Sequence, residues 1–251
     1  MPQKICGVIP ARLASTRLPG KMLLNQTGKP LLQHVWERVA ATELFDELVI
    51  ATDATEIFQV AETFGANVEM TGEHVSGTDR VAEVIRRRAD QFEIVVNVQG
   101  DEPEIDRGHI SKVIESLLVV PKAQMSTLAA PLRRWESIAA TSCVKVVTDS
   151  TGRALYFSRS VIPFPRDGFD ESILLGPSPW RLHVGIYGFR TDFLLQLTTW
   201  PQSPLEKLEK LEQLRALEAG VHIQVADVDH PSVGIDTPED YAQFVERMRN
   251  V

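Results

Sequence analysis

The sequence predicts an α/β fold: a doubly wound, mostly parallel sheet with a β-rich insertion. Three observations support this. In the first half of the chain, short apolar runs alternate with segments of helical periodicity, the order that builds a parallel sheet covered by helices. A loop rich in cations follows the first apolar run. From about residue 125, strand-like runs succeed one another with few helical segments between them, and we place the insertion at about 125–190.

The elements of the first half follow from apolar spacing and from residues that end helices. Leu31, Leu32, Val35 and Val39 repeat at helical spacing. The second helix is expected to begin at a Thr55 cap and to close at Gly65. The expected strands are 5–10, 48–51, 67–70 and 94–98, and the expected helices are 31–41, 55–64 and 78–88.

The second half is predicted from the same signals. Strands are expected at 125–132, 143–148, 154–158 and 183–190, with an irregular, proline-bracketed loop at 164–181. Ser203, Pro204 and Glu206 form an N-cap, a first-turn proline and a capping box for a helix that Gly220 ends. Leucines at every third position from 205 to 217 predict that this helix is buried on several sides. A strand at 222–228 and a helix at 238–248 complete one domain spanning 1–251.

The chain is acidic, with 26 basic and 34 acidic side chains and a net charge of 26 − 34 = −8. This balance disfavours nucleic acid and anionic membranes as partners. No apolar run approaches the roughly 18 residues that cross a bilayer, and the N-terminus shows no signal-peptide pattern. Cys6 and Cys143 each lie in an apolar, strand-like run, which favours free core thiols and a cytoplasmic location.

Against this acidic background, the loop after the first strand is cationic. It carries Arg12, Arg17 and Lys21, the hydroxyls of Ser15 and Thr16, and no acid. A loop of this composition at the carboxyl end of a sheet strand suits an anion such as a triphosphate. A solvated basic turn is the alternative.

Two aspartates are candidates for a metal site. Asp101 ends the strand at 94–98, where a carboxylate is well placed to hold Mg²⁺, although Asp beside Gly is also common in turns. Asp236 precedes the last helix, but Thr237 can fill the cap position there and leaves Asp236 available. Glu212 falls among the leucines and could simply reach the surface, and a single histidine such as His183 is more often structural.

Several common motifs are absent from the sequence. Gly20-Lys21 is not part of a Walker A loop, and no G-x-G-x-x-G, H-E-x-x-H, C-x-x-C or G-x-S-x-G is present. A nicotinamide cofactor is therefore unsupported.

Eight stretches, in chain order, resemble the 3-deoxy-manno-octulosonate (Kdo) cytidylyltransferases. The resemblance spans nearly the whole chain, and its later stretches are the more specific ones. Asp79 stands where the family often has Glu. The stretches are IPARLASTRLPGK (9–21), SGTDR (76–80), NVQGDEP (97–103), ALYFSR (154–159), Ile162-Pro163, HVGIYG (183–188), LEQLRAL (211–217) and GIDTPED (234–240).

The resemblance implies a nucleotide-diphospho-sugar transferase type of fold and a specific activity. CMP would pass from CTP to the anomeric hydroxyl of Kdo, giving CMP-Kdo and pyrophosphate for lipopolysaccharide biosynthesis, in a homodimer joined through the insertion. A related acid sugar, 8-amino-Kdo or a sialic acid, is the alternative substrate. A glycosyltransferase is disfavoured because the strand ending at Asp101 lacks Asp-x-Asp. A non-catalytic nucleotide sensor is disfavoured because Arg12, Lys21, Asp101 and Asp236 are all present.

The resemblance also implies roles for individual residues. Arg12, Lys21, Asp101 and Asp236 would be catalytic, with Mg²⁺ on the two aspartates. The nucleotide would contact Pro10, Ala11, Arg12, Ser15, Lys21, Ser76, Gly77 and Gln99. The sugar would contact Arg17, Arg80, Gln99, Arg159, His183, Tyr187, Glu212 and Gln213. No general base is assigned, and His183 is not proposed for that role.

Overall fold

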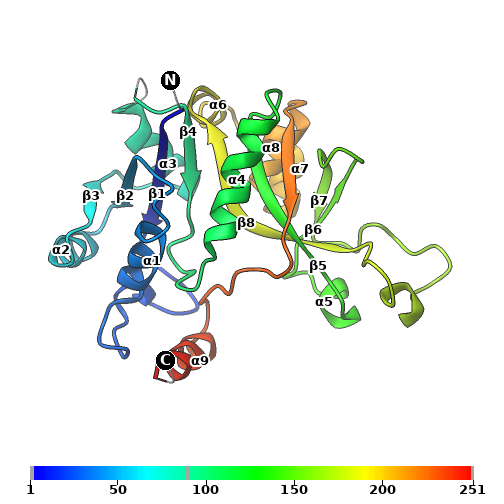
Figure 1. The fold of residues 1–251 in the computed structure, drawn as a ribbon, viewed down its shortest axis with the longest axis horizontal. Coiled ribbons are helices and arrows are strands. Elements are labelled where there is room, and N and C mark those ends of the chain that lie inside the picture. The colour runs from blue at the N-terminus through cyan, green and yellow to red at the C-terminus, as the bar shows by residue number, and fades with distance from the viewer. Residues whose placement is uncertain (1–2, 89–90, 250–251) are drawn as a thin grey trace. The chain divides into compact units, whose positions relative to one another are not determined.

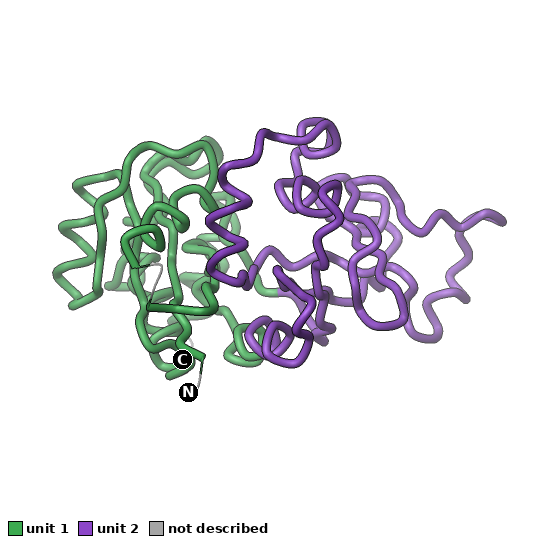
Figure 2. The backbone as a smooth tube through the Cα atoms, turned by 90° about the horizontal axis from the view of Figure 1, so that it is seen from above, with its two compact units in different colours: residues 1–111, 232–251 green, residues 112–231 purple. Residues whose placement is uncertain are grey.

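The computed structural model describes residues 3–88 and 91–249. It divides into two compact units, residues 1–111 with 232–251 and residues 112–231 (Figure 2). The first unit thus combines the N-terminal part of the chain with its C-terminal end.

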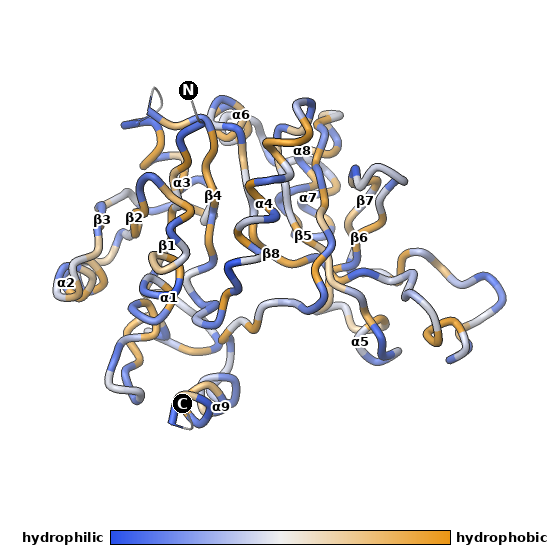
Figure 3. The backbone as a smooth tube through the Cα atoms, in the orientation of Figure 1, coloured by the Kyte–Doolittle hydropathy of each residue, from blue (hydrophilic) through white to orange (hydrophobic). Residues whose placement is uncertain are grey.

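The first unit is built on a parallel sheet in the order β3-β2-β1-β4 (Figure 1). Its central strands are lined by fully buried Val and Ile, and the tube along β4 is hydrophobic in Figure 3, as expected for a strand covered on both faces. The predicted strands and helices are confirmed to within a few residues. They are β1 (Ile5–Ala11), β2 (Glu47–Thr52), β3 (Asn67–Met70), β4 (Ile94–Asn97), α1 (Leu31–Ala40), α2 (Thr55–Thr63) and α3 (Gly77–Arg86).

Strand register brings the carboxyl ends of this sheet together. Ala11 at the end of β1 pairs with Thr52 at the end of β2, and Val8 pairs with Asn97 at the end of β4. The loops that follow these strands therefore leave from one edge of the sheet, which in open α/β sheets is the edge that binds ligands.

The C-terminal helix α9 (Pro238–Arg249) packs onto the same region. Tyr241, Phe244 and Val245 form a core cluster with Leu18 of the cationic loop and Leu31 of α1. The phenol oxygen of Tyr241 also accepts a hydrogen bond from the Gln26 backbone at 2.9 Å. This packing holds the segment before α9, which carries Asp236, beside the loop after β1.

The second unit contains a mixed sheet. β8 (Arg181–Arg190) pairs antiparallel with β5 (Met125–Pro131), which pairs parallel with β9 (Ile223–Asp227). β6 (Lys145–Thr148) and β7 (Ala154–Ser158) form an antiparallel pair. The predicted run of strands is confirmed. Short helices that the sequence pattern did not predict interrupt it: α5 (Trp135–Ala139), η2 (Glu171–Leu174) and α6 (Thr191–Leu197).

The prediction of a single helix over 205–217 is wrong. The chain forms α7 (Pro204–Glu209) and α8 (Gln213–Glu218), separated by Lys210 in the left-handed conformation at φ +56°. Leu208 on α7 is 80% exposed, whereas Leu211 and Leu214 are buried. The leucines are therefore divided between two short helices and the turn that joins them, and they do not surround a single buried helix. The Ser203–Glu206 capping box and the left-handed Gly220 are confirmed.

Two further local expectations are corrected. Thr55 is the first residue of α2 and does not cap it; the hydroxyl of Thr52 instead accepts a hydrogen bond from the Ala54 backbone at 3.2 Å. Cys143 lies in the turn before β6 and is half-buried, not in a strand. Both cysteines are free, and burial raises the pKa of Cys6 to about 12.

Among the described residues, no helix has the length and the apolar character needed to span a membrane.

Candidate active site

The loop after β1 turns back on itself before a short 3-10 helix, η1 (Lys21–Leu23). Gly20 makes this turn possible because it adopts φ +66°, a conformation that costs an L-residue energy. Its backbone N–H donates to Leu13 O, and that of Lys21 donates to Leu18 O. The turn aims the Lys21 side chain inward, so that Lys21 is only 7% exposed.

The buried ammonium of Lys21 brings the two candidate aspartates together. Its Nζ lies 2.5 Å from Asp101 Oδ2, 3.0 Å from Asp236 Oδ1 and 2.9 Å from the carbonyl oxygen of Ile235. The backbone N–H of Ile235 donates to Asp101 O at 2.9 Å, which fastens the two segments directly. Asp101 and Asp236, 135 positions apart in sequence, therefore lie close enough to contact the same ammonium group.

These groups line a cavity of about 740 Å³. Gly100 lies in the cavity wall. It packs so closely against the end of β1 that an added Cβ would lie 3.0 Å from Pro10 O. Of the residues predicted to bind substrate or metal, the cavity brings together Pro10, Ala11, Arg12, Ser15, Arg17, Lys21, Ser76, Gly77, Arg80, Gln99, Asp101 and Asp236.

The cationic side chains of the cavity differ in whether they already have a partner within the protein. Arg17 is exposed and pairs with Asp236 at 2.8 Å. Arg12 is exposed, and within residues 3–88 and 91–249 it makes no ion pair or hydrogen bond. Its guanidinium can therefore meet an incoming anion without breaking an existing contact.

The guanidinium of Arg80 is already paired with other side chains of the protein. Its Nη2 lies 2.6 Å from Asp53 Oδ2, and its Nη1 donates to Thr71 Oγ1 at 2.5 Å. The side chain is only 4% exposed. Arg80 lines the cavity, but its charge is already matched by Asp53, which follows β2.

Ser76 caps α3. Its hydroxyl accepts the Asp79 backbone N–H at 3.1 Å and lies 2.9 Å from Asp79 Oδ2. Gly77 follows closely against the Pro10 ring, where an added Cβ would lie 3.4 Å from Pro10 Cγ. The start of α3 therefore forms a wall of the cavity next to the end of β1.

The remaining predicted sugar residues belong to the second unit, where three of them lie together. His183 and Tyr187 are four positions apart on β8, with ring centroids 5.4 Å apart. The Tyr187 hydroxyl donates to Gln213 Oε1 at 3.3 Å, and Nε2 of the buried Gln213 has no hydrogen-bond partner among the described residues. That unpaired amide is a donor to which a ligand oxygen could bind.

Burial also sets the protonation states of this group. Desolvation lowers the pKa of His183 to about 3, so the imidazole is neutral at pH 7. Desolvation, with the nearby Glu212 carboxylate, raises the pKa of Tyr187 well above its usual range. His183 Nε2 also lies 3.0 Å from Thr127 Oγ1. The cluster therefore offers neutral hydrogen-bonding groups, which is consistent with leaving His183 out of a general-base role.

Arg159 is held by a set of contacts that the sequence did not reveal. Its N–H donates to Glu209 Oε2 and its Nε to Glu209 O, while Nη1 donates to Thr141 O. Its carbonyl accepts from the buried Lys145 Nζ at 2.7 Å. No local pattern marks Lys145 or Glu209, because both act through partners distant in the sequence.

The chain matches the family described as cytidylyltransferase over residues 6–223. The chain belongs to the cytidylyltransferase family. Its relatives include 3-deoxy-manno-octulosonate cytidylyltransferases of Geobacter sulfurreducens, 47% identical over 98% of this chain and 99% of the relative, and of Solibacter usitatus, 47% identical over 96% and 92%. These similarities confirm the resemblance found in the sequence and identify the chain as a nucleotidyltransferase.

A solved structure supports the same family. The structure of CMP:2-keto-3-deoxy-manno-octonic acid synthetase complexed with CTP is 38% identical, has a TM-score of 0.90 and covers 98% of this chain and 99% of its own. A 4-diphosphocytidyl-2C-methyl-D-erythritol synthase from Anaerococcus prevotii is 14% identical with a TM-score of 0.65, which supports the fold alone. The predicted α/β cytidylyltransferase fold is confirmed.

Proposed function

We propose that this cytidylyltransferase transfers CMP from CTP to the anomeric hydroxyl of Kdo, giving CMP-Kdo and pyrophosphate. The names of its relatives and the CTP complex of a similar structure support this choice of substrates. The observation that carries it is the meeting of the cationic loop, Lys21, Asp101 and Asp236 in one cavity.

The chain's own residues would act mainly by positioning substrates and neutralising charge, which is the main catalytic task in phosphoryl transfer. Arg12 would bind the triphosphate. Lys21 uses its three donors within the protein, so it would exchange one of these contacts for a phosphate oxygen. Both cations would offset the negative charge that builds up on the departing pyrophosphate.

Asp101 and Asp236 suit Mg²⁺. Their side chains are 25% and 43% exposed, both line the cavity, and both supply the oxygen ligands that Mg²⁺ prefers. The ion is commonly held by one or two carboxylates together with substrate phosphates, so a pair of aspartates is sufficient. When bound, Mg²⁺ would polarise phosphate oxygens and help the sugar hydroxyl lose its proton.

Among the residues that the family resemblance assigns to the sugar, Arg17 and Gln99 belong to the first unit, and the second unit contributes Arg159, His183, Tyr187, Glu212 and Gln213. An acid sugar needs cations for its carboxylate and neutral hydrogen-bonding groups for its hydroxyls. The arginines supply the first, while neutral His183, Tyr187 and the unpaired Gln213 amide supply the second. Arg80 would reach the sugar only by giving up Asp53.

The test is pyrophosphate release measured across nucleotides and sugars. Release should require CTP, Mg²⁺ and Kdo together. Equal rates with UTP, or without sugar, would contradict the proposal. Faster turnover with 8-amino-Kdo or a sialic acid would instead identify the alternative substrate.

We also propose that the enzyme works in the cytoplasm as a homodimer formed through residues 125–190. Phe164 and Leu175, in the proline-rich loop of this segment, are 78% and 88% exposed. A second copy of the chain that removed these side chains from water would gain hydrophobic stabilisation. Light scattering after size-exclusion chromatography should give twice the 28.0 kDa chain mass, and a monomer at assay concentration would contradict this assignment.

A further inference from the structure

The segment between β3 and α3 has no helix or strand over residues 71–76, yet it forms part of the cavity wall. His74, Val75 and Ser76 line the cavity, and Val75 is 87% exposed. A segment without regular structure has no backbone ladder to fix its shape, so its side-chain contacts must do so.

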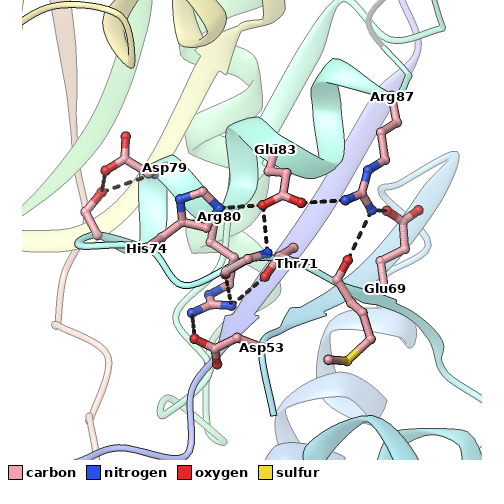
Figure 4. Close-up of polar contacts among 11 residues, drawn as sticks. Asp53, Glu69, Thr71, His74, Asp79, Arg80, Glu83 and Arg87 are labelled. Atoms are coloured by element: carbon pink, nitrogen blue, oxygen red, sulfur yellow. Dashed lines mark hydrogen bonds and ion pairs between the residues drawn. The ribbon is translucent and has the colours of Figure 1, made fainter. Parts of the chain in front are cut away.

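The contacts come from one face of α3 (Figure 4). Arg80, Glu83 and Arg87 are spaced by three and four residues, which places them on the same side of a helix. Figure 4 shows these side chains pointing toward the segment and toward the strand before it.

Glu83 makes the central contacts. Its Oε2 accepts the backbone N–H of Gly72 at 3.0 Å and lies 2.5 Å from His74 Nε2. Its Oε1 pairs with Arg87, which also donates to Glu69 Oε2 at 2.9 Å and to Met70 O at 3.2 Å. One carboxylate thus joins the segment at two points and is itself anchored to β3.

Arg80 fixes the beginning of the same segment. Its guanidinium bridges Thr71 Oγ1 to Asp53, which follows β2. Ser76, at the end of the segment, is fixed by capping α3. Glu83 therefore supplies the restraint in the middle, at Gly72 and His74, where no helix or strand does so.

We propose that Glu83 is a positioning residue that holds residues 72–76 in the shape that receives the cytidine part of CTP. The inference rests on the proposed function, because it takes the cavity to be the CTP site. Glu83 itself does not line the cavity, so it would act through Gly72 and His74. The hydrogen bond from His74 lowers the pKa of Glu83, which is consistent with a charged carboxylate in this role.

The test compares CTP affinity in three variants of the full chain. Glu83→Ala should weaken CTP binding, measured by titration calorimetry with Mg²⁺ present, about tenfold, the effect of losing hydrogen bonds to a charged group. Glu83→Gln keeps the size and one acceptor and should recover part of the affinity. Glu73→Ala is the matched control, since Glu73 is an exposed carboxylate in the same segment that lies outside the cavity lining.

A split between kinetic constants separates positioning from general damage. The KM for CTP should rise about tenfold in Glu83→Ala while the KM for Kdo and kcat at saturating CTP stay within about twofold. Unchanged CTP affinity in Glu83→Ala, or an equal loss in Glu73→Ala, would overturn the inference, as would a parallel rise in both KM values. A wild-type chain that binds CTP but does not turn over Kdo would contradict the proposed function. The calorimetric comparison would still test the role of Glu83, because it measures CTP binding alone.

Discussion

At the scale of single residues, Lys21 shows how a site can be stable before its substrate binds. Two carboxylates facing one cavity repel each other, and the lysine ammonium between them offsets that repulsion. Because the lysine comes from the cationic loop and the aspartates from two other segments, the contact also fixes the relative positions of all three segments.

Asp101→Asn tests the role of the carboxylate. The amide has nearly the same shape but no charge, so it would lose affinity for a divalent cation. Pyrophosphate release should fall by about 100-fold or more. The thermal midpoint should stay within a few degrees, because the asparagine oxygen can still accept a hydrogen bond from Lys21 and the backbone contact of Asp101 with Ile235 remains. Asp229→Asn, at an exposed aspartate in another loop, is the control. Full activity in Asp101→Asn would remove the residue from the catalytic set.

Arg159→Ala tests whether Arg159 binds the sugar. Because its guanidinium would bind the sugar carboxylate, the KM for Kdo should rise at least about tenfold and far more than the KM for CTP. Arg159 also donates to the backbone at Glu209 and Thr141, so Arg159→Lys, which keeps the charge and loses the forked donors, separates charge from anchoring. An equal effect on both KM values would move Arg159 out of the sugar site.

At the scale of elements, the break between α7 and α8 contains a residue in an unfavourable backbone conformation. Lys210 adopts a left-handed backbone that favours glycine. Lys210→Gly should therefore raise the free energy of unfolding by about 0.5–1 kcal/mol, measured by urea denaturation. Lys207→Gly, at an exposed helical position of α7, should lower it by about 1 kcal/mol. A loss of stability in Lys210→Gly similar to that in Lys207→Gly would show that the left-handed strain is not significant.

The same region shows where prediction from the sequence ends. The strands β1, β2 and β4 and the helix α1 were predictable because burial imposes a clear apolar pattern on each. The break at Lys210 was not, because leucine spacing remains helical through it and no glycine marks it. The helix α4 (Arg107–Val119) is absent from the predicted elements, although Ile110, Val113, Ile114 and Leu117 repeat at the spacing of a buried helix face.

The candidate site divides in the same way. Arg12, Lys21 and Asp101 could be proposed from composition and their place after strands, and Asp236 from its place before the last helix. The structure brings all four to one cavity. The side chains that pair with Arg80 could not be predicted, because no sequence pattern links Asp53 or Thr71 to it. Glu83 was missed for the same reason, since its contacts with Gly72 and His74 exist only in the folded chain.

At the scale of the whole molecule, buried titratable groups make stability depend on pH in opposite directions. Burial lowers the pKa of His183 from 6.5 to about 3. The contribution of its neutral form is therefore complete above pH 6.5 and is lost as the pH falls toward 3. Desolvation and the Asp101 charge raise the pKa of Glu102 from 4.5 to about 7, so its contribution is complete below pH 4.5 and is lost as the pH rises toward 7.

His183→Gln isolates the histidine term. Glutamine can keep a hydrogen bond to Thr127 but does not titrate, so the variant should lose less stability than the wild type between pH 7 and pH 5. The difference can grow by at most about 1.4 kcal/mol per pH unit, the limit for one proton. Urea unfolding at both pH values measures it, and His230→Gln, at an exposed histidine, is the control. If the stabilities of the wild type and His183→Gln fall in parallel as the pH is lowered, then His183 accepts its proton without unfolding the site, and the buried neutral imidazole assigned to the sugar pocket is wrong.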